Sequence, residues 1–173
     1  MHMENLTKTS KVLLYFTSLF FILWLGGYVA RHLSIYQFFE PENLELRTIF
    51  NKVVLQSHLY LILPLIVFNI ITYIFFLISF ILFLFISKIN LKLEGWLLII
   101  TLIIFITAPF EIFLLIKDYE IAKNIYYNLS DANSIINMLR DRITILSSFS
   151  LIEIFSYCGV LFLIIFQPLR KVK

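Results

Sequence analysis

The stretch "GWLLIITLIIFITAPFEIFLLI", from Gly95 to Ile116, decides the fold class of this chain. Glu111 is its single charged residue, and Glu94 and Lys117 bracket it. A helix needs about 20 mostly apolar residues to cross the hydrocarbon core of a bilayer. The segment therefore predicts one membrane-spanning helix and raises the question of why a carboxylate lies within it.

The composition places the whole chain in the membrane class. Of its 173 residues, 61% are hydrophobic and only 14% are charged, with a mean hydropathy of +0.94. Soluble domains are typically about 45–50% apolar and about 25% charged. The net charge of +3 is modest and no basic cluster alternates with aromatics, so we expect a lipid bilayer as partner and no nucleic acid.

Charged residues divide the apolar sequence into four spans, at about residues 12–30, 61–86, 95–116 and 145–168. The second apolar run, between Lys52 and Lys88, is too long for one crossing and too short for two. We predict an amphipathic lead-in helix over Asn43–Tyr60 before the second span. A solvated extension of the second span is the alternative. The predicted fold is an all-α, four-helix membrane bundle forming a single domain over residues 1–173.

The basic residues favour one orientation. Equal numbers of Lys and Arg fall on the two sides of a four-span chain, but those on the side of the termini lie in three short segments. The positive-inside rule gives short flanks the most weight. We therefore expect both termini in the cytoplasm, for a protein of the bacterial inner membrane or of an organellar membrane.

Polar residues gather in the outward half of the predicted spans. Glu111 and Glu153 both lie outward of the centres of their helices, and Ser150, Glu153 and Tyr157 form one stripe at helical spacing. Such stripes should face the bundle interior, because lipid cannot satisfy them. We expect the candidate cluster to contain Arg31, His32, His58, Asn69, Glu111, Glu153 and Tyr157. Gly26, Gly27 and Ala30 offer small side chains for close helix packing on the first span.

Several roles fit this cluster, and the sequence leaves them open. It can be a structural group that fixes the register of the helices, in which Arg31, His32 or His58 pairs with the carboxylates. It can bind or conduct protons or ions through Glu111 and Glu153. His32 and His58 are weak candidates for metal or haem b ligation, and a quinone or lipid headgroup pocket is a further alternative. The structural role is consistent with a subunit of a larger membrane complex, and it requires no cofactor.

No catalytic motif is present. The sequence contains no HExxH, no GxSxG and no glycine-rich phosphate loop, and it has only four glycines. Its single cysteine, Cys158, cannot form an intramolecular disulfide and is expected to be a small buried hydrophobe. We expect a protein that is not an enzyme.

Three features resemble known four-span families. They are "LWLGGYV" (Leu23–Val29), a proline late in the third span (Pro109) and the entry "MLRDRITILS" (Met138–Ser147). Together they resemble the copper-resistance protein D membrane domain and related uncharacterised four-helix membrane proteins. The resemblance implies a four-span fold. The histidines that such families often carry in the first and fourth spans are missing here, so it does not extend to copper handling.

Overall fold

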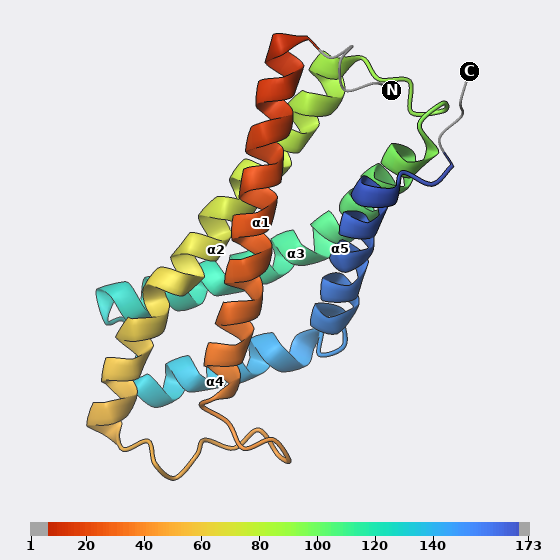
Figure 1. Cartoon of the computed structure of the whole chain (residues 1–173). Coiled ribbons are helices and arrows are strands. Elements are labelled where there is room, and N and C mark those ends of the chain that lie inside the picture. Colours follow the sequence, from red (N-terminus) through yellow and green to blue (C-terminus); the bar gives the residue numbers. More distant parts are fainter. Residues whose placement is uncertain (1–6, 170–173) are drawn as a thin grey trace.

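The computed structural model describes residues 7–169, most of which lie in helices (Figure 1). Its five helices are α1 (Lys8–Tyr36), α2 (Lys52–Ser87), α3 (Gly95–Tyr127), α4 (Ala132–Ile145) and α5 (Phe149–Phe166). Over residues 7–169 there is no strand, only an isolated bridge between Phe39 and Leu46. Four helices, α1, α2, α3 and α5, are long and apolar enough to cross a membrane. The all-helical prediction is confirmed, but the helix besides the four long ones is α4, which precedes the last span rather than the second.

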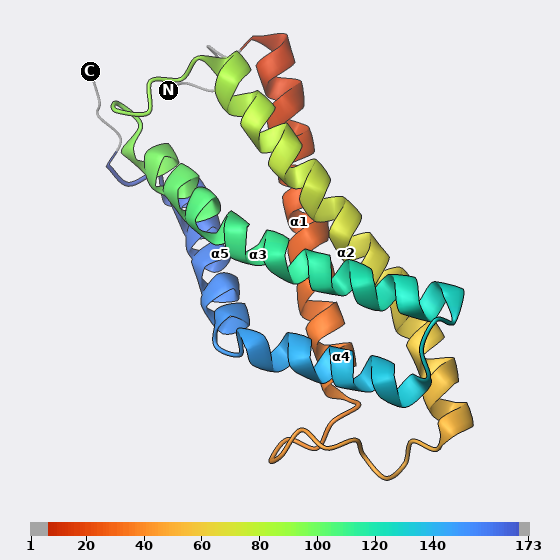
Figure 2. The same ribbon diagram turned by 180° about the vertical axis from the view of Figure 1, so that it is seen from behind.

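The helices define two ends of the molecule. One end, which we call the terminal end, contains the starts of α1 and α3 and the ends of α2 and α5 (Figure 1). The end of α1, the start of α2 and all of α4 lie toward the opposite end, which we call the α4 end. Seen from behind, α3 crosses the α1–α2 pair obliquely, and α4 runs back beneath it (Figure 2).

The α1–α2 pair is held by aromatic packing. Trp24 lies 5.0 Å from Tyr73 and 5.9 Å from Phe76 between ring centroids, and Phe20 stacks on Phe75 at 5.2 Å. Gly27 permits the close approach, because a Cβ atom there would lie 3.1 Å from the Phe68 ring.

The small-residue contact differs from the one expected. Gly26 and Ala30 face outward, and nothing lies within 4 Å of a Cβ placed at Gly26. Only Gly27 of the expected group is buried against α2, because it lies one position further round the helix.

The expected lead-in helix over Asn43–Tyr60 is wrong in its first half. Residues 37–51 form turns, with Leu44 in a left-handed conformation at φ 54°. The helix begins only at Lys52, because the Asn51 side chain caps it by accepting from the Val54 amide at 3.0 Å. From there α2 continues without interruption through Pro64 to Ser87, as the alternative of an extended second span proposed.

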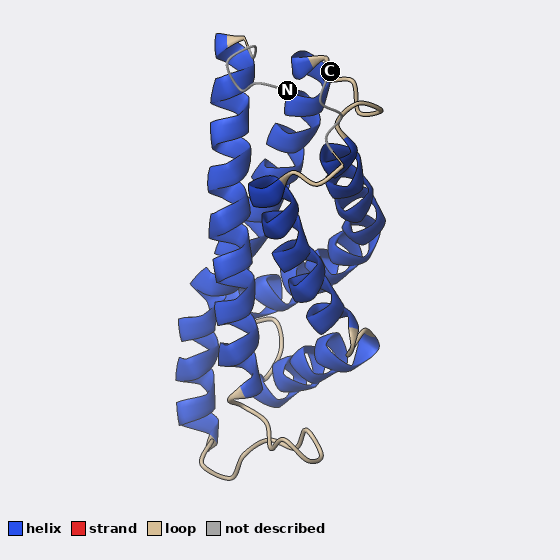
Figure 3. Cartoon of the chain, turned by 45° about the vertical axis from the view of Figure 1, so that its right-hand side comes forward, coloured by secondary structure: helices blue, strands red, loops and turns tan. Residues whose placement is uncertain are grey.

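The fourth apolar segment is also shorter than expected. α5 begins at Phe149 rather than near residue 145, because residues 146–148 form a turn after α4. α4 is a separate amphipathic helix that buries Ile135, Ile136, Leu139 and Ile143 together with Arg142. Figure 3 shows α4 packed across the spans rather than continuing α5.

Candidate functional site

The centre of the candidate site is an ion-paired aspartate on α3. Asp118 is fully buried, and its Oδ1 accepts from Arg142 Nε at 3.0 Å. Its Oδ2 accepts from Arg31 Nη1 and from Arg142 Nη2, the latter at 3.4 Å. Arg31 is 0% and Arg142 is 3% exposed. One carboxylate thus joins α1, α3 and α4 through two buried guanidinium groups.

The electrostatic setting of Arg142 follows from this pairing. Burial alone would lower the pKa of its guanidinium, but the carboxylates of Asp118 and Glu111 outweigh burial and raise the pKa. Arg142 therefore keeps its positive charge inside the protein.

Glu111 and Glu153 lie beside this ion-paired centre and are both fully buried. Each interacts electrostatically with the other and with Arg31 and Arg142. The Tyr28 hydroxyl also lies next to the Glu153 carboxyl, but no hydrogen bond of ordinary geometry joins any oxygen of the two glutamates to another group in residues 7–169. Two buried carboxyl groups thus lie near two guanidinium groups, and within residues 7–169 neither carboxyl group accepts a hydrogen bond from them.

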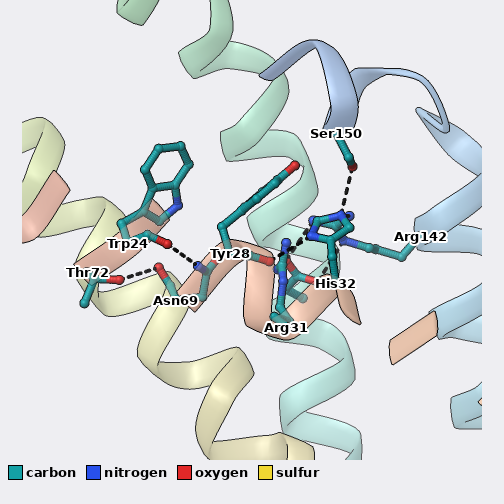
Figure 4. Close-up of polar contacts among 9 residues, drawn as sticks. Trp24, Tyr28, Arg31, His32, Asn69, Thr72, Arg142 and Ser150 are labelled. Carbon is teal, nitrogen blue, oxygen red and sulfur yellow. Dashed lines mark hydrogen bonds and ion pairs between the residues drawn. The ribbon is translucent and has the colours of Figure 1, made fainter. Parts of the chain in front are cut away.

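His32 connects the site to α5 (Figure 4). Its Nε2 lies 2.9 Å from Ser150 Oγ and 3.3 Å from Arg142 Nη1, and its Nδ1 lies 3.0 Å from the Tyr28 carbonyl. A carbonyl only accepts and a guanidinium only donates. The geometry therefore fits a neutral ring with the proton on Nδ1, and both ring nitrogens are in use.

Aromatic and hydroxyl groups close the site on the side of the terminal end. Tyr157 and Thr107 hydroxyls lie 2.9 Å apart, and Trp24 lies 4.8 Å from the Tyr157 ring between centroids. Asn69 Nδ2 donates to the Trp24 carbonyl at 3.2 Å (Figure 4). The hydroxyls of Tyr28 and Tyr73 are buried, with no hydrogen bond of ordinary geometry in the described part of the chain.

His58 lies elsewhere. It is exposed near the start of α2, where its ring packs edgewise on Phe50 at 5.3 Å and its Nδ1 lies 2.8 Å from the Val54 carbonyl. Of the three candidate partners of the glutamates, His58 therefore lies outside the group around Asp118. Residues 7–169 contain no group of three or more His, Cys, Asp or Glu side chains arranged to hold a metal ion.

Of the residues expected from the sequence, the structure brings Arg31, His32, Glu111 and Glu153 together. Tyr157 and Asn69 lie at the border of the group. The Tyr157 hydroxyl is hydrogen-bonded to Thr107, and Asn69 donates to the Trp24 carbonyl. Asp118 and Arg142, which two hydrogen bonds join, are not among the residues expected from the sequence. Asp118 follows Glu111 by seven residues and therefore lies on the same helical face, a signal that the sequence contains.

A separate cavity lies between α1, α2, α3 and α5 at the terminal end. Its volume is about 270 Å³, and most of its lining is apolar, including Phe21, Phe76, Phe80, Ile104 and Val160. The Phe21 and Phe76 rings also contact Tyr157, at 5.7 and 6.4 Å between centroids. An apolar wall therefore separates the cavity from the charged residues.

Comparison with protein-family models, with curated proteins and with solved structures found no match to this chain.

Proposed function

We propose that this chain is a four-span integral membrane protein with a structural role, as a subunit of a membrane complex, and that it is not an enzyme. The observation that carries the proposal is the Arg31–Asp118–Arg142 arrangement, which binds three helices through one buried carboxylate. Removing one partner of a buried ion pair costs about 3–5 kcal/mol, because the remaining charge is left without compensation. Such an arrangement makes helix positions interdependent.

The outer surfaces of the long helices support membrane placement. Phe85 is 77% exposed, Phe155 and Ile165 are each 72% exposed, and they lie on two different helices. Large apolar side chains exposed at this scale need a cover of lipid or protein. We place both termini on the cytoplasmic side, because the short described segments at the terminal end contain Lys8, Lys11, Lys88 and Lys92, as the positive-inside rule expects of a cytoplasmic face.

α5 is the helix that we assign to partner contact. In the most apolar 18-residue stretch of each long helix, only 17% of α5 is buried within the chain, whereas 28–44% is buried in the other three helices. Its outward residues are large and apolar, namely Leu151, Ile152, Phe155, Phe162, Ile165 and Phe166. In a bilayer this surface fits either lipid or the helix of another membrane subunit.

A second candidate role is binding of a quinone or a similar apolar molecule, which the cavity of about 270 Å³ favours. Small-molecule sites are concave and mostly apolar. Haem b ligation by His32 is not proposed, because both of its ring nitrogens already contact protein groups.

The test is gentle purification from native membranes, followed by an absorption spectrum, mass analysis of extracted small molecules and identification of co-purifying proteins. We expect stoichiometric partner proteins and a spectrum without a Soret band. Substituting Phe155→Asn on the exposed face of α5 should release the partner, whereas Phe85→Asn on α2 should not. Purification of the unaltered chain alone, without partner proteins, would refute the subunit role. A stoichiometric quinone would instead support the second candidate.

A further inference from the structure

The buried side chains around Asp118 do not balance in charge if every carboxyl group is ionised. The site contains two guanidinium groups, on Arg31 and Arg142, and three carboxyl groups, on Glu111, Asp118 and Glu153. His32 contributes no charge in the tautomer that its contacts define. Full ionisation of the carboxyl groups would leave one uncompensated negative charge.

An uncompensated charge in this place is costly. Glu111, Asp118 and Glu153 are each 0% exposed, so water does not screen them. An unpaired buried ion carries an effective penalty of several kcal/mol. The Asp118 carboxylate is committed to the two arginines, whereas the glutamates have no such hydrogen bonds. The proton that restores neutrality therefore belongs to the glutamates.

We propose that Glu111 and Glu153 form a buried proton-binding site that holds one shared proton. Two adjacent carboxyl groups that cannot both ionise share a proton as a pair. Binding of a proton taken up from water forms one O–H bond on either glutamate and changes the charge of the pair from −2 to −1, which balances the net charge of +1 on the Arg31–Asp118–Arg142 group.

The groups facing the pair come from every helix around it. Tyr28 and Arg31 face it from α1, Tyr73 from α2, Asp118 from α3, Arg142 from α4 and Tyr157 from α5. The buried hydroxyls of Tyr28 and Tyr73 have no hydrogen-bond partner of ordinary geometry in residues 7–169. The Tyr28 hydroxyl lies next to the Glu153 carboxyl and can donate to it when that group is ionised.

The structure also favours one direction of access. Toward the α4 end, Tyr28 lies beside Ser150 and His32, which are both half-buried and hydrogen-bonded to one another at 2.9 Å. Toward the terminal end, the hydroxyl pair of Tyr157 and Thr107 is followed by the apolar cavity wall of Phe21, Phe76 and Val160, and these three side chains have no proton to exchange. The site therefore exchanges its proton through Ser150 and His32.

Infrared spectroscopy of the purified chain in lipid nanodiscs tests the shared proton directly, through the C=O stretch of a neutral carboxylic acid. At neutral pH the unaltered protein should show the band of one such acid. Glu111→Gln and Glu153→Gln should each abolish it, because the remaining glutamate then supplies the one balancing negative charge. Arg142→Gln should raise the band about twofold, because both glutamates are then neutral. Glu120→Gln, on the exposed surface of α3, is the matched control and should change nothing.

The competing outcomes are distinct. A wild-type spectrum without the band, or a band that survives in both single glutamine variants, would overturn the proposal. If Arg142→Gln does not fold, as judged by its helical circular dichroism, the two glutamine variants still decide. For the route, Ser150→Ala should slow the deuterium shift of the band in D₂O, whereas Ser18→Ala in the cavity lining should not. The reverse result would place the entry at the terminal end and refute the route. None of these readouts depends on the role of the chain as a subunit.

Discussion

Replacing Asp118 with Asn tests the central ion pairing most directly. The substitution keeps the shape of the side chain but removes the one carboxylate that accepts from both Arg31 and Arg142. Both guanidinium groups are at most 3% exposed, so each is left without water or an opposite charge in direct contact. Breaking a buried pair in this way costs about 3–5 kcal/mol of unfolding free energy.

The same helix supplies a matched control. Lys117 and Glu120 form an ion pair at 3.3 Å, with side chains 39% and 47% exposed. Glu120→Gln changes the net charge by the same amount as Asp118→Asn, yet exposed pairs contribute only about 0–1 kcal/mol. The two variants therefore differ in burial and not in charge.

The assay is reversible unfolding in mixed micelles of mild detergent and dodecyl sulfate, followed by circular dichroism. We expect Asp118→Asn to lose about 3–5 kcal/mol and Glu120→Gln to lose less than about 1 kcal/mol. Glu111 and Glu153 can supply the missing negative charge by releasing their proton, so adding Glu111→Gln to Asp118→Asn should destabilise the protein by more than the sum of the two single effects. Equal losses for Asp118→Asn and Glu120→Gln would refute the assignment of Asp118 as the energetic centre of the site.

Three further predictions use other parts of the chain. Gly27→Leu should destabilise the protein by about 1–3 kcal/mol in the same unfolding assay, since the Phe68 ring and the Asn69 side chain must move. Gly26→Ala meets no neighbour and should be neutral or slightly stabilising. Asn51→Ala removes the cap of α2 and should cost about 1 kcal/mol; no loss of stability would show that the cap does not fix the start of the helix. Cys158 is exposed on α5, and membrane placement predicts that a charged, membrane-impermeant maleimide leaves it unlabelled in intact vesicles but labels it after denaturation. Equally fast labelling in both states would contradict the placement of α5 in the bilayer.

The sequence predicts the helical class well because the physical cause is local. Apolar segments bounded by charges, such as Gly95–Ile116, form helices whatever their neighbours are, since a membrane requires internal hydrogen bonding. Departures arise where local polar groups compete with the helix. The Asn51 side chain starts α2 later than the hydrophobic pattern suggests, and Ser147 and Ser148 lie in the turn that separates α4 from α5.

The candidate site is predictable only in part. Helical spacing and depth select Glu111 and Glu153, and both lie in the buried group. The sequence does not select Asp118, because Lys117 marks the predicted end of the third span, although α3 continues to Tyr127. Arg142 could not be found from spacing, because its position depends on α4 folding back across the bundle. Cys158, expected to be buried, is exposed, because on α5 the face toward the chain is the one that holds Glu153 and Tyr157.

The order of the charged residues along the chain has a consequence for biosynthesis. Arg31 and Asp118 are separated by 87 positions, and Arg142 follows Asp118 by 24 more. At about 5–20 residues per second, a ribosome makes Asp118 roughly 4–17 s after Arg31. During that interval the arginine has no carboxylate to meet, and the newly made helix depends on lipid headgroups or on the insertion machinery. Nascent chains that fail to close around Asp118 would expose an unpaired arginine to membrane quality control, so defects in this site should lower protein abundance in the cell before any mature protein is formed.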